Sequence, residues 1–257
     1  MSFFKKVMAS VGIGNMEVDT RLERDRLVPG EEVNGVIHIR GGKVDQQVER
    51  MNIAVKTEYL RERDDHKFKH SAEIVKYQVA DHLLVKAGSN HEIPFSIPLP
   101  IETPSSLGRT PIWIQTDLDI DMAVDPQDRD YIEVLPHPYV ATILDALNHL
   151  GFHLKKTQNE YTGKYGRSLP FIQEYEFVPT GHFRGHLDEL EFIFMPQPNG
   201  LEFIVEVDRA ARGLSGLFAE ALDMDETKHR MFVSAEDLEV GPQGVADKLN
   251  QFLQSMI

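Results

Sequence analysis

The alternation of apolar and polar residues dominates the first half of the chain. Apolar side chains recur at every second position, which is the period of a strand with one buried face. Such runs cover residues 16–22, 33–40, 51–59, 75–79, 112–122 and 131–135. Turn sequences such as Val28-Pro29-Gly30-Glu31 separate them. Short, evenly spaced strands without helical periods between them predict an antiparallel β-sandwich over residues 14–135.

Three prolines mark one strand of this domain. Pro94, Pro98 and Pro100 interrupt the apolar run from Ile93 to Ile101. Because proline has no N–H to donate to a neighbouring strand, we expect this segment at an edge or an end of a sheet. An open sheet edge can accept an extended segment of another protein. The three prolines are therefore candidate partner-binding residues.

The period changes in the second half of the chain. After Leu135-Pro136-His137-Pro138, apolar residues recur every three or four positions, which predicts a helix over residues 139–150. Alternation then returns, and Asn199-Gly200 between two alternating runs predicts a β-hairpin. Helical spacing reappears over residues 243–256. We therefore expect a second β-sandwich domain over residues 136–257, with a linker helix and a C-terminal helix.

Residues 1–13 have an apolar face of their own. Phe3, Phe4 and Val7 recur at helical spacing, while Lys5 and Lys6 lie off that face. One interpretation is an amphipathic helix that docks on the domain behind it. The other is a contact with a partner or a membrane surface, for which basic residues beside an apolar stripe are typical. Phe3 and Phe4 are therefore candidate partner-binding residues as well.

Composition narrows the class of protein. The 257 residues have the length of two domains of ordinary size. The chain has no cysteine, which excludes disulfide scaffolds, thiol catalysis and cysteine-based zinc sites and fits a cytoplasmic protein. A net charge of −14 disfavours nucleic acid as a partner. No apolar stretch approaches the ~18 residues of a membrane-spanning helix, so we expect a soluble protein.

The sequence lacks the patterns that carry common enzymatic chemistry. It has no nucleophile elbow, no phosphate-binding glycine loop and no dinucleotide fingerprint. The pairs His182/His186 and His149/His153 have the spacing of metal ligands on a helix, but glycines break a helix at both places. We therefore expect no catalytic residues, no cofactor and no metal site.

Acidic residues crowd one predicted strand. Asp117, Asp119 and Asp121 alternate along residues 112–122 and share a face. A solvated strand face accounts for them, but they are also candidates for polar contacts between the two domains, with arginine as the partner. The acidic run from Asp117 to Asp130 lacks the glycine and the distal glutamate of a calcium loop. The sequence leaves open whether this run binds a cation.

Several segments resemble a known family. Residues 28–35 are similar to the opening turn and strand of arrestin-type domains, and residues 93–100 are similar to their proline-punctuated strand. The start Ser2-Phe3-Phe4-Lys5-Lys6 and the stretches 118–126 and 190–209 resemble bacterial sporulation-control proteins with an arrestin-like fold (stage-zero M type). The resemblance covers nearly the whole chain. It implies a mainly β protein of two arrestin-like β-sandwiches and a non-enzymatic regulator in the cytoplasm.

The function belongs to one of three classes. The first is a regulator or scaffold that acts through contacts with other proteins. The alternative is a peripheral membrane or cell-division adaptor that uses the helix over residues 1–13. The third is a hydrolase without a recognised motif, which requires a pocket with two carboxylates, or a Ser–His pair, of perturbed pKa. A homodimer through a strand edge or the C-terminal helix is compatible with all three.

Overall fold

The computed structural model describes residues 16–63, 66–120, 125–162, 168–209 and 227–256. The predicted helix over residues 1–13, with Phe3 and Phe4, and Asp121 lie outside these ranges. The chain divides into two compact units, each with its own hydrophobic core. Unit 1 comprises residues 1–58, 71–103 and 111–135, and unit 2 comprises residues 59–70, 104–110 and 136–257.

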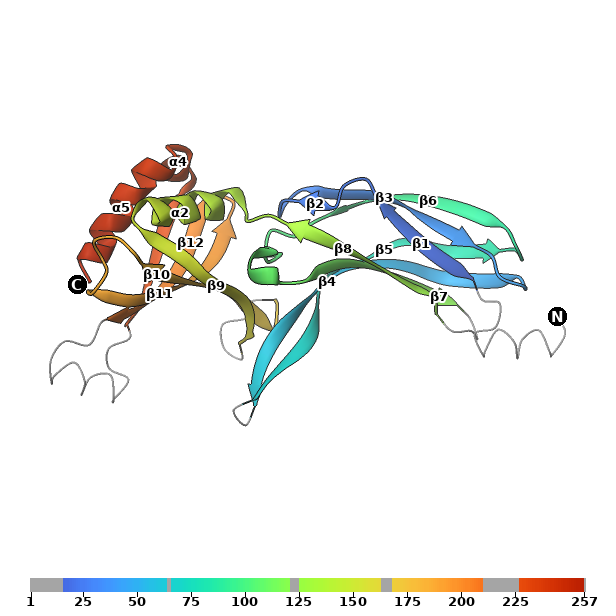
Figure 1. Cartoon of the computed structure of the whole chain (residues 1–257). Coiled ribbons are helices and arrows are strands. Elements are labelled where there is room, and N and C mark those ends of the chain that lie inside the picture. The colour runs from blue at the N-terminus through green and yellow to red at the C-terminus, as the bar shows by residue number, and fades with distance from the viewer. Residues whose placement is uncertain (1–15, 64–65, 121–124, 163–167, 210–226, 257) are drawn as a thin grey trace. The chain divides into compact units, whose positions relative to one another are not determined.

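Unit 1 is a sandwich of two sheets (Figure 1). One sheet has the strand order β1-β3-β6, and the other has the order β5-β4-β7-β8, with β2 added to β8 by a short parallel pair. The far ends of β4 and β5 belong to unit 2. The strands are β1 (Glu17–Leu22), β2 (Arg26–Leu27), β3 (Glu32–Arg40), β4 (Gln46–Arg63), β5 (His66–Val85), β6 (Asn90–Pro98), β7 (Ile112–Ile120) and β8 (Gln127–Val134).

The predicted two-residue period builds the core of this sandwich. In β3, Val33, Gly35, Ile37 and Ile39 are buried, and the residues that alternate with them are more exposed. The side chains that meet them come from β4, β6 and β7 and are also buried: Met51, Ile53, Val55, Phe95, Ile97, Ile112, Ile114, Leu118 and Ile120. Burying each such side chain contributes about 1.5–3 kcal/mol relative to leaving it in water.

The single tryptophan of the chain, Trp113, lies in unit 1 on β7. It is on the face of β7 opposite to the sandwich core, yet its side chain is buried. The guanidinium carbon of Arg129, on β8, lies 4.7 Å from the centre of its ring. This cation–π contact covers the indole and keeps it out of water.

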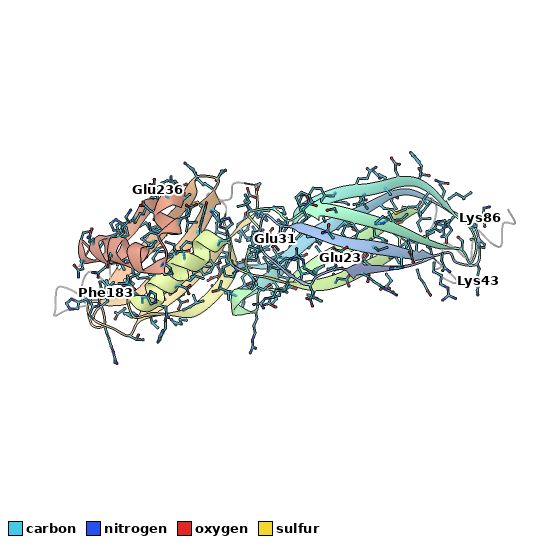
Figure 2. The ribbon with its side chains drawn as sticks, turned by 90° about the horizontal axis from the view of Figure 1, so that it is seen from above. Glu23, Glu31, Lys43, Lys86, Phe183 and Glu236 are labelled. Carbon is cyan, nitrogen blue, oxygen red and sulfur yellow. The ribbon has the colours of Figure 1, made fainter. Side chains whose placement is uncertain are left out.

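Unit 2 is an antiparallel sheet with helices on one face, and Figure 2 looks onto this helical side. The strand order is β9-β10-β11-β12-β13, and the end of β4 adds to β9 in parallel at Leu60 and Glu160. No helix within the described ranges is long and apolar enough to cross a membrane. The elements are η1 (Leu107–Arg109), α2 (Pro138–His149), β9 (Phe152–Tyr161), β10 (Phe171–Pro179), β11 (Leu187–Gln197), β12 (Gly200–Arg209), β13 (Thr227–Ser234), α4 (Ala235–Glu239) and α5 (Pro242–Gln254).

The helices of unit 2 take the place that the sequence prediction gave to a second sheet. Ile143 and Leu147 of α2, and Val245 and Leu249 of α5, belong to one core with the apolar face of the sheet. Each helix has a single apolar stripe, and one layer of such stripes is enough to bury one face of a sheet. The fold is mainly β, as predicted, but the described part of unit 2 is a sheet with a helical layer rather than a second sandwich.

The end of the β4–β5 hairpin packs against the end of β9 within unit 2. The rings of Tyr59 and Tyr161 are stacked with 6.1 Å between their centres, and the guanidinium carbon of Arg61 lies 4.5 Å from the centre of the Tyr161 ring. Lys67 donates a hydrogen bond of 2.9 Å to Glu160. The hairpin therefore fixes the position of Tyr161.

Phenylalanines form the centre of the unit 2 core. Phe192 on β11 is completely buried, and its ring centre lies 5.4 to 5.6 Å from those of Phe177, Phe194 and Phe203. Aromatic pairs at such distances add about 0.5–1.5 kcal/mol each beyond the burial of their area. Phe192 therefore lies at the centre of the phenylalanine cluster on the sheet side of this core.

We expect Phe192→Ala to lower the free energy of unfolding by about 3–5 kcal/mol, because it leaves a cavity at the centre of the cluster. Urea denaturation followed by circular dichroism measures the loss. Phe232→Ala is the matched control, since Phe232 lies on the edge strand β13 with 46% of its surface exposed. Its loss should stay below about 1 kcal/mol, and equal losses for the two variants would contradict the central role of Phe192.

Candidate functional site

The open face of the unit 2 sheet, turned away from the helices, carries an ordered array of charges. The strand register places Lys156, Glu176, Glu191, Glu206 and Lys228 in one row across the five strands. Side chains directly opposite one another on antiparallel strands have Cβ atoms about 4.5–5.5 Å apart. The row therefore sets three glutamates side by side, with a lysine at each end.

A second row beside the first is partly apolar. It contains Glu174, Ile193, Ile204 and Arg230 in register, and Ile172 lies two residues before Glu174 on the same face of β10. The three isoleucines are half-buried. A hollow of about 520 Å³ lies over both rows, with Tyr161 among its lining residues. The open face thus combines an apolar floor with carboxylates and basic groups.

Two carboxylates of the hollow differ from their neighbours. Glu206 lies 2.7 Å from the Nζ atom of Lys228, but Glu174 and Glu191 have neither an ion pair nor a hydrogen bond to a described residue. Burial, and then the neighbouring Glu191, raise the pKa of Glu174 to about 7. Burial, and then Glu206, raise the pKa of Glu191. In the folded protein, both carboxyl groups are therefore harder to ionise than they would be in water.

Beside the hollow, a lysine and two glutamates form a compact group. Lys155 contacts Glu176, and its Nζ atom lies 3.3 Å from Glu189. The hydrogen bond between the two carboxyl groups lowers the pKa of Glu176, while burial and then the same bond raise the pKa of Glu189 to about 7. Oxygens of Glu176, Glu189 and Glu191 lie within 4.8 Å of one another, as in a site for a hard cation. Lys155 and the hydrogen bond between Glu176 and Glu189 offset part of this negative charge.

The hydrolase hypothesis required two carboxylates of perturbed pKa in a pocket, and the hollow contains such a pair. However, the pKa values of Glu174 and Glu191 both move upwards. Acid–base catalysis uses an acid and a base whose pKa values are pushed apart. Glu176 and Glu189 do differ in this way, but they bond to each other directly, whereas a retaining glycosidase keeps its carboxyls about 5 Å apart around the sugar. The open face is better suited to binding than to hydrolysis.

The candidate prolines of unit 1 lie on or directly after β6, and among the described strands β6 pairs only with β3. The expected edge position is therefore confirmed. The N–H of Leu99 donates to the carbonyl of Glu31 at 2.8 Å, which fixes the backbone groups that face β3. By alternation, Pro94 and Pro98 turn their nitrogens to the outer edge. The outer edge of β6 therefore lacks two N–H donors. The hydroxyl of Tyr77 also donates a hydrogen bond of 3.1 Å to the carbonyl of Pro98.

A partner strand added to this edge would meet an incomplete ladder of hydrogen bonds. Prolines on exposed edges protect proteins from unwanted strand pairing. Partner binding through Pro94, Pro98 and Pro100 stays a prediction, and the geometry favours contacts with their side chains over strand addition.

Two of the three predicted interdomain aspartates lie in the described ranges, and both have partners within unit 1. Asp119 accepts two hydrogen bonds from Arg50 of β4, at 2.6 and 3.1 Å. Asp117 accepts one from the side-chain amide of Gln115 at 2.9 Å. The strand face shared by Asp117 and Asp119 is thus as expected. A contact between domains through Asp117, Asp119 and Asp121 stays a prediction, and the structure does not test whether the acidic run binds a cation.

The glutamates of the open face are absent from the site residues predicted from the sequence. Alternation does place Glu191 and Glu206 on the polar faces of their strands. The missing information was the pairing of β10 with β11, which brings Glu174 and Glu176 beside them. The available signal was the alternation of Phe171, Tyr175 and Phe177 with polar residues, which is typical of one more half-buried strand.

We expect Pro94→Thr/Pro98→Thr to increase self-association, because the change restores two outward N–H donors to the β6 edge. Light scattering coupled to size-exclusion chromatography, over a range of protein concentrations, measures the effect. Ser96→Thr is the control, since it adds a threonine to the same strand without adding a donor. A double variant that associates no more than the unmodified chain would show that the prolines do not protect this edge.

We expect Glu174→Gln to stabilise the protein at neutral and alkaline pH. The folded chain holds the Glu174 proton more tightly than the unfolded chain, so this group's contribution to stability falls as the pH rises from about 4.5 to about 7. Glutamine removes that loss, and the gain should grow from near zero at about pH 4 to about 1 kcal/mol at about pH 8, after allowance for solvent screening. Urea titrations at several pH values measure it. Exposed Glu23→Gln, the control, should give no such trend.

Comparisons with known proteins identify relatives that match nearly the whole chain. Residues 4–211 match the model of the family described as SpoOM protein. The sporulation-control protein spo0M of Bacillus subtilis (strain 168) is 42% identical over 240 residues, which are 93% of this chain and 93% of that protein. The crystal structure of Spo0M, sporulation control protein, from Bacillus subtilis has a TM-score of 0.86 and 39% identity, over 95% of this chain and 100% of that chain. The resemblance to sporulation-control proteins inferred from the sequence is confirmed, and the chain belongs to the SpoOM protein family.

Proposed function

We propose that this chain is a cytoplasmic regulator in the control of sporulation that acts through contacts with other proteins. The relative from Bacillus subtilis is a sporulation-control protein by name. The alignment of the two proteins covers 93% of each, so the role is proposed for the whole chain rather than for one unit.

The open face of unit 2 is the observation that supports a contact mechanism. Its floor consists of the half-buried Ile172, Ile193 and Ile204, and charged groups surround them. Apolar surface combined with charged and polar groups is the usual composition of a protein interaction surface. The described helices cover the other face of the same sheet, so among the described elements this face is the side open to a partner.

The other hypotheses have less support among the described residues. The pKa values of Glu174 and Glu191 do not diverge as hydrolysis needs, and Glu176 and Glu189, whose pKa values do diverge, lack the spacing. The membrane or cell-division adaptor depends on residues 1–13, which lie outside the described ranges. Protein contact is therefore the mechanism that the geometry supports best.

The test is to place a charge on the apolar floor without touching the core. Ile204→Glu changes a half-buried residue of the open face, and Val240→Glu changes a residue of the same unit that is 72% exposed. We expect Ile204→Glu to shift the sporulation frequency of the host towards that of a strain without the chain, and Val240→Glu to behave as the unmodified chain. Plate counts of heat-resistant spores measure the frequency, and thermal melting of the purified variants checks their folding.

A normal sporulation frequency with Ile204→Glu would contradict the role of the open face. If both variants shifted the frequency equally, the effect would come from added charge in general rather than from this surface.

A further inference from the structure

Two carboxylates at the centre of the open face lack the cation that their neighbours have. Glu206 is paired with Lys228 at 2.7 Å, and Glu202 is paired with Arg230 at 3.2 Å. These pairs engage Lys228 and Arg230, the lysine and the arginine that line the hollow on β13. Glu174 and Glu191 are half-buried and have no such partner among the described residues.

The register brings these two carboxylates close enough to share one cation. Glu174 is directly opposite Ile193, and Glu191 lies two residues before Ile193 on the same strand. The two glutamates are therefore diagonal neighbours, and diagonal positions lie about 7–8 Å apart. A single ammonium or guanidinium group between them can reach both carboxylates.

Apolar surface adjoins the two carboxylates within the same hollow. Ile193 is next to Glu174 across the strands, Ile204 is opposite Ile193, and Ile172 lies on the same face of β10. The hollow of about 520 Å³ is within the usual size of ligand sites in proteins. A ligand that fills it must therefore satisfy both the carboxylates and the isoleucines.

The composition of the hollow limits the chemistry of that ligand. An inorganic cation would neutralise the carboxylates but leave the isoleucines in water. A purely apolar segment would cover the isoleucines but bury two carboxylates further without a partner, which is costly. Lysine and arginine place a charge at the end of an apolar stem, so one such residue between apolar neighbours meets both needs.

We propose, on the basis of the proposed function, that the hollow binds a segment of a partner protein that carries a lysine or arginine between apolar residues. The cationic group lies between Glu174 and Glu191, and the apolar neighbours cover Ile172, Ile193 and Ile204. The net charge of −14 attracts such a basic segment at long range. The raised pKa values of both glutamates agree with carboxyl groups whose negative charge is not compensated by a neighbouring cation.

The experiment starts from an unbiased set of ligands. A phage-displayed library of random peptides is selected on the immobilised full chain, and one enriched peptide is titrated by fluorescence anisotropy. We expect the enriched peptides to share a lysine or arginine beside isoleucine, leucine, valine or phenylalanine. Replacing that basic residue by glutamine, or using Glu174→Gln/Glu191→Gln as the protein, should each raise the Kd about tenfold or more.

A matched double variant separates local from general electrostatics. Glu23→Gln/Glu102→Gln removes the same number of charges from exposed positions of unit 1, where Figure 2 labels Glu23. It should change the Kd less than about twofold, because neither residue lines the hollow and salt screens exposed charges. The absence of enrichment, enriched peptides without a cation, or full affinity of Glu174→Gln/Glu191→Gln would each overturn the proposal.

The outcomes also separate this inference from the proposed function. If Ile204→Glu alters sporulation while the selection gives no basic peptides, the surface acts in sporulation but its partner has another chemistry. If basic peptides bind while Ile204→Glu sporulates normally, the hollow has the inferred specificity but the sporulation role of this face fails.

Discussion

The requirement that one face of the unit 2 sheet be mainly apolar determines much of this unit. α2 and α5 cover that face, and the side chains of a strand alternate between two faces, so the charged residues of the sheet collect on the other one. Glu174, Glu176 and Glu191 are thereby gathered on adjacent strands, although their charges repel. The charged array of the open face is thus a consequence of how the core is built.

Charge is distributed unevenly over this array. At the edges, lysine and arginine residues compensate the glutamates, as on an ordinary protein surface. At the centre, Glu174 and Glu191 are half-buried beside isoleucine and have no cation of their own among the described residues. A folded protein rarely buries carboxylates in this way without a partner. The region that costs folding energy is therefore the region where binding can recover it.

The sequence predicted those features that depend on local chemistry. The missing N–H of proline places Pro94 and Pro98 at an edge, and the two-residue period identifies the core positions of β3, β4 and β7. The helices over residues 139–150 and 243–256 also follow from their spacing. What the helices cover is not a local property, because an apolar stripe does not identify the surface that it packs on. The open face was missed for the same reason, since strand pairing joins residues far apart in the sequence.

The position of Trp113 has a further consequence. It is the only tryptophan of the 257 residues, and its buried ring, covered by Arg129, belongs to unit 1. The open face belongs to unit 2, where the described aromatic residues are phenylalanine and tyrosine. Intrinsic tryptophan emission therefore reports on unit 1, whereas the residues that line the hollow belong to unit 2. A change in that emission when the hollow fills would show that binding to unit 2 alters the surroundings of a residue in unit 1.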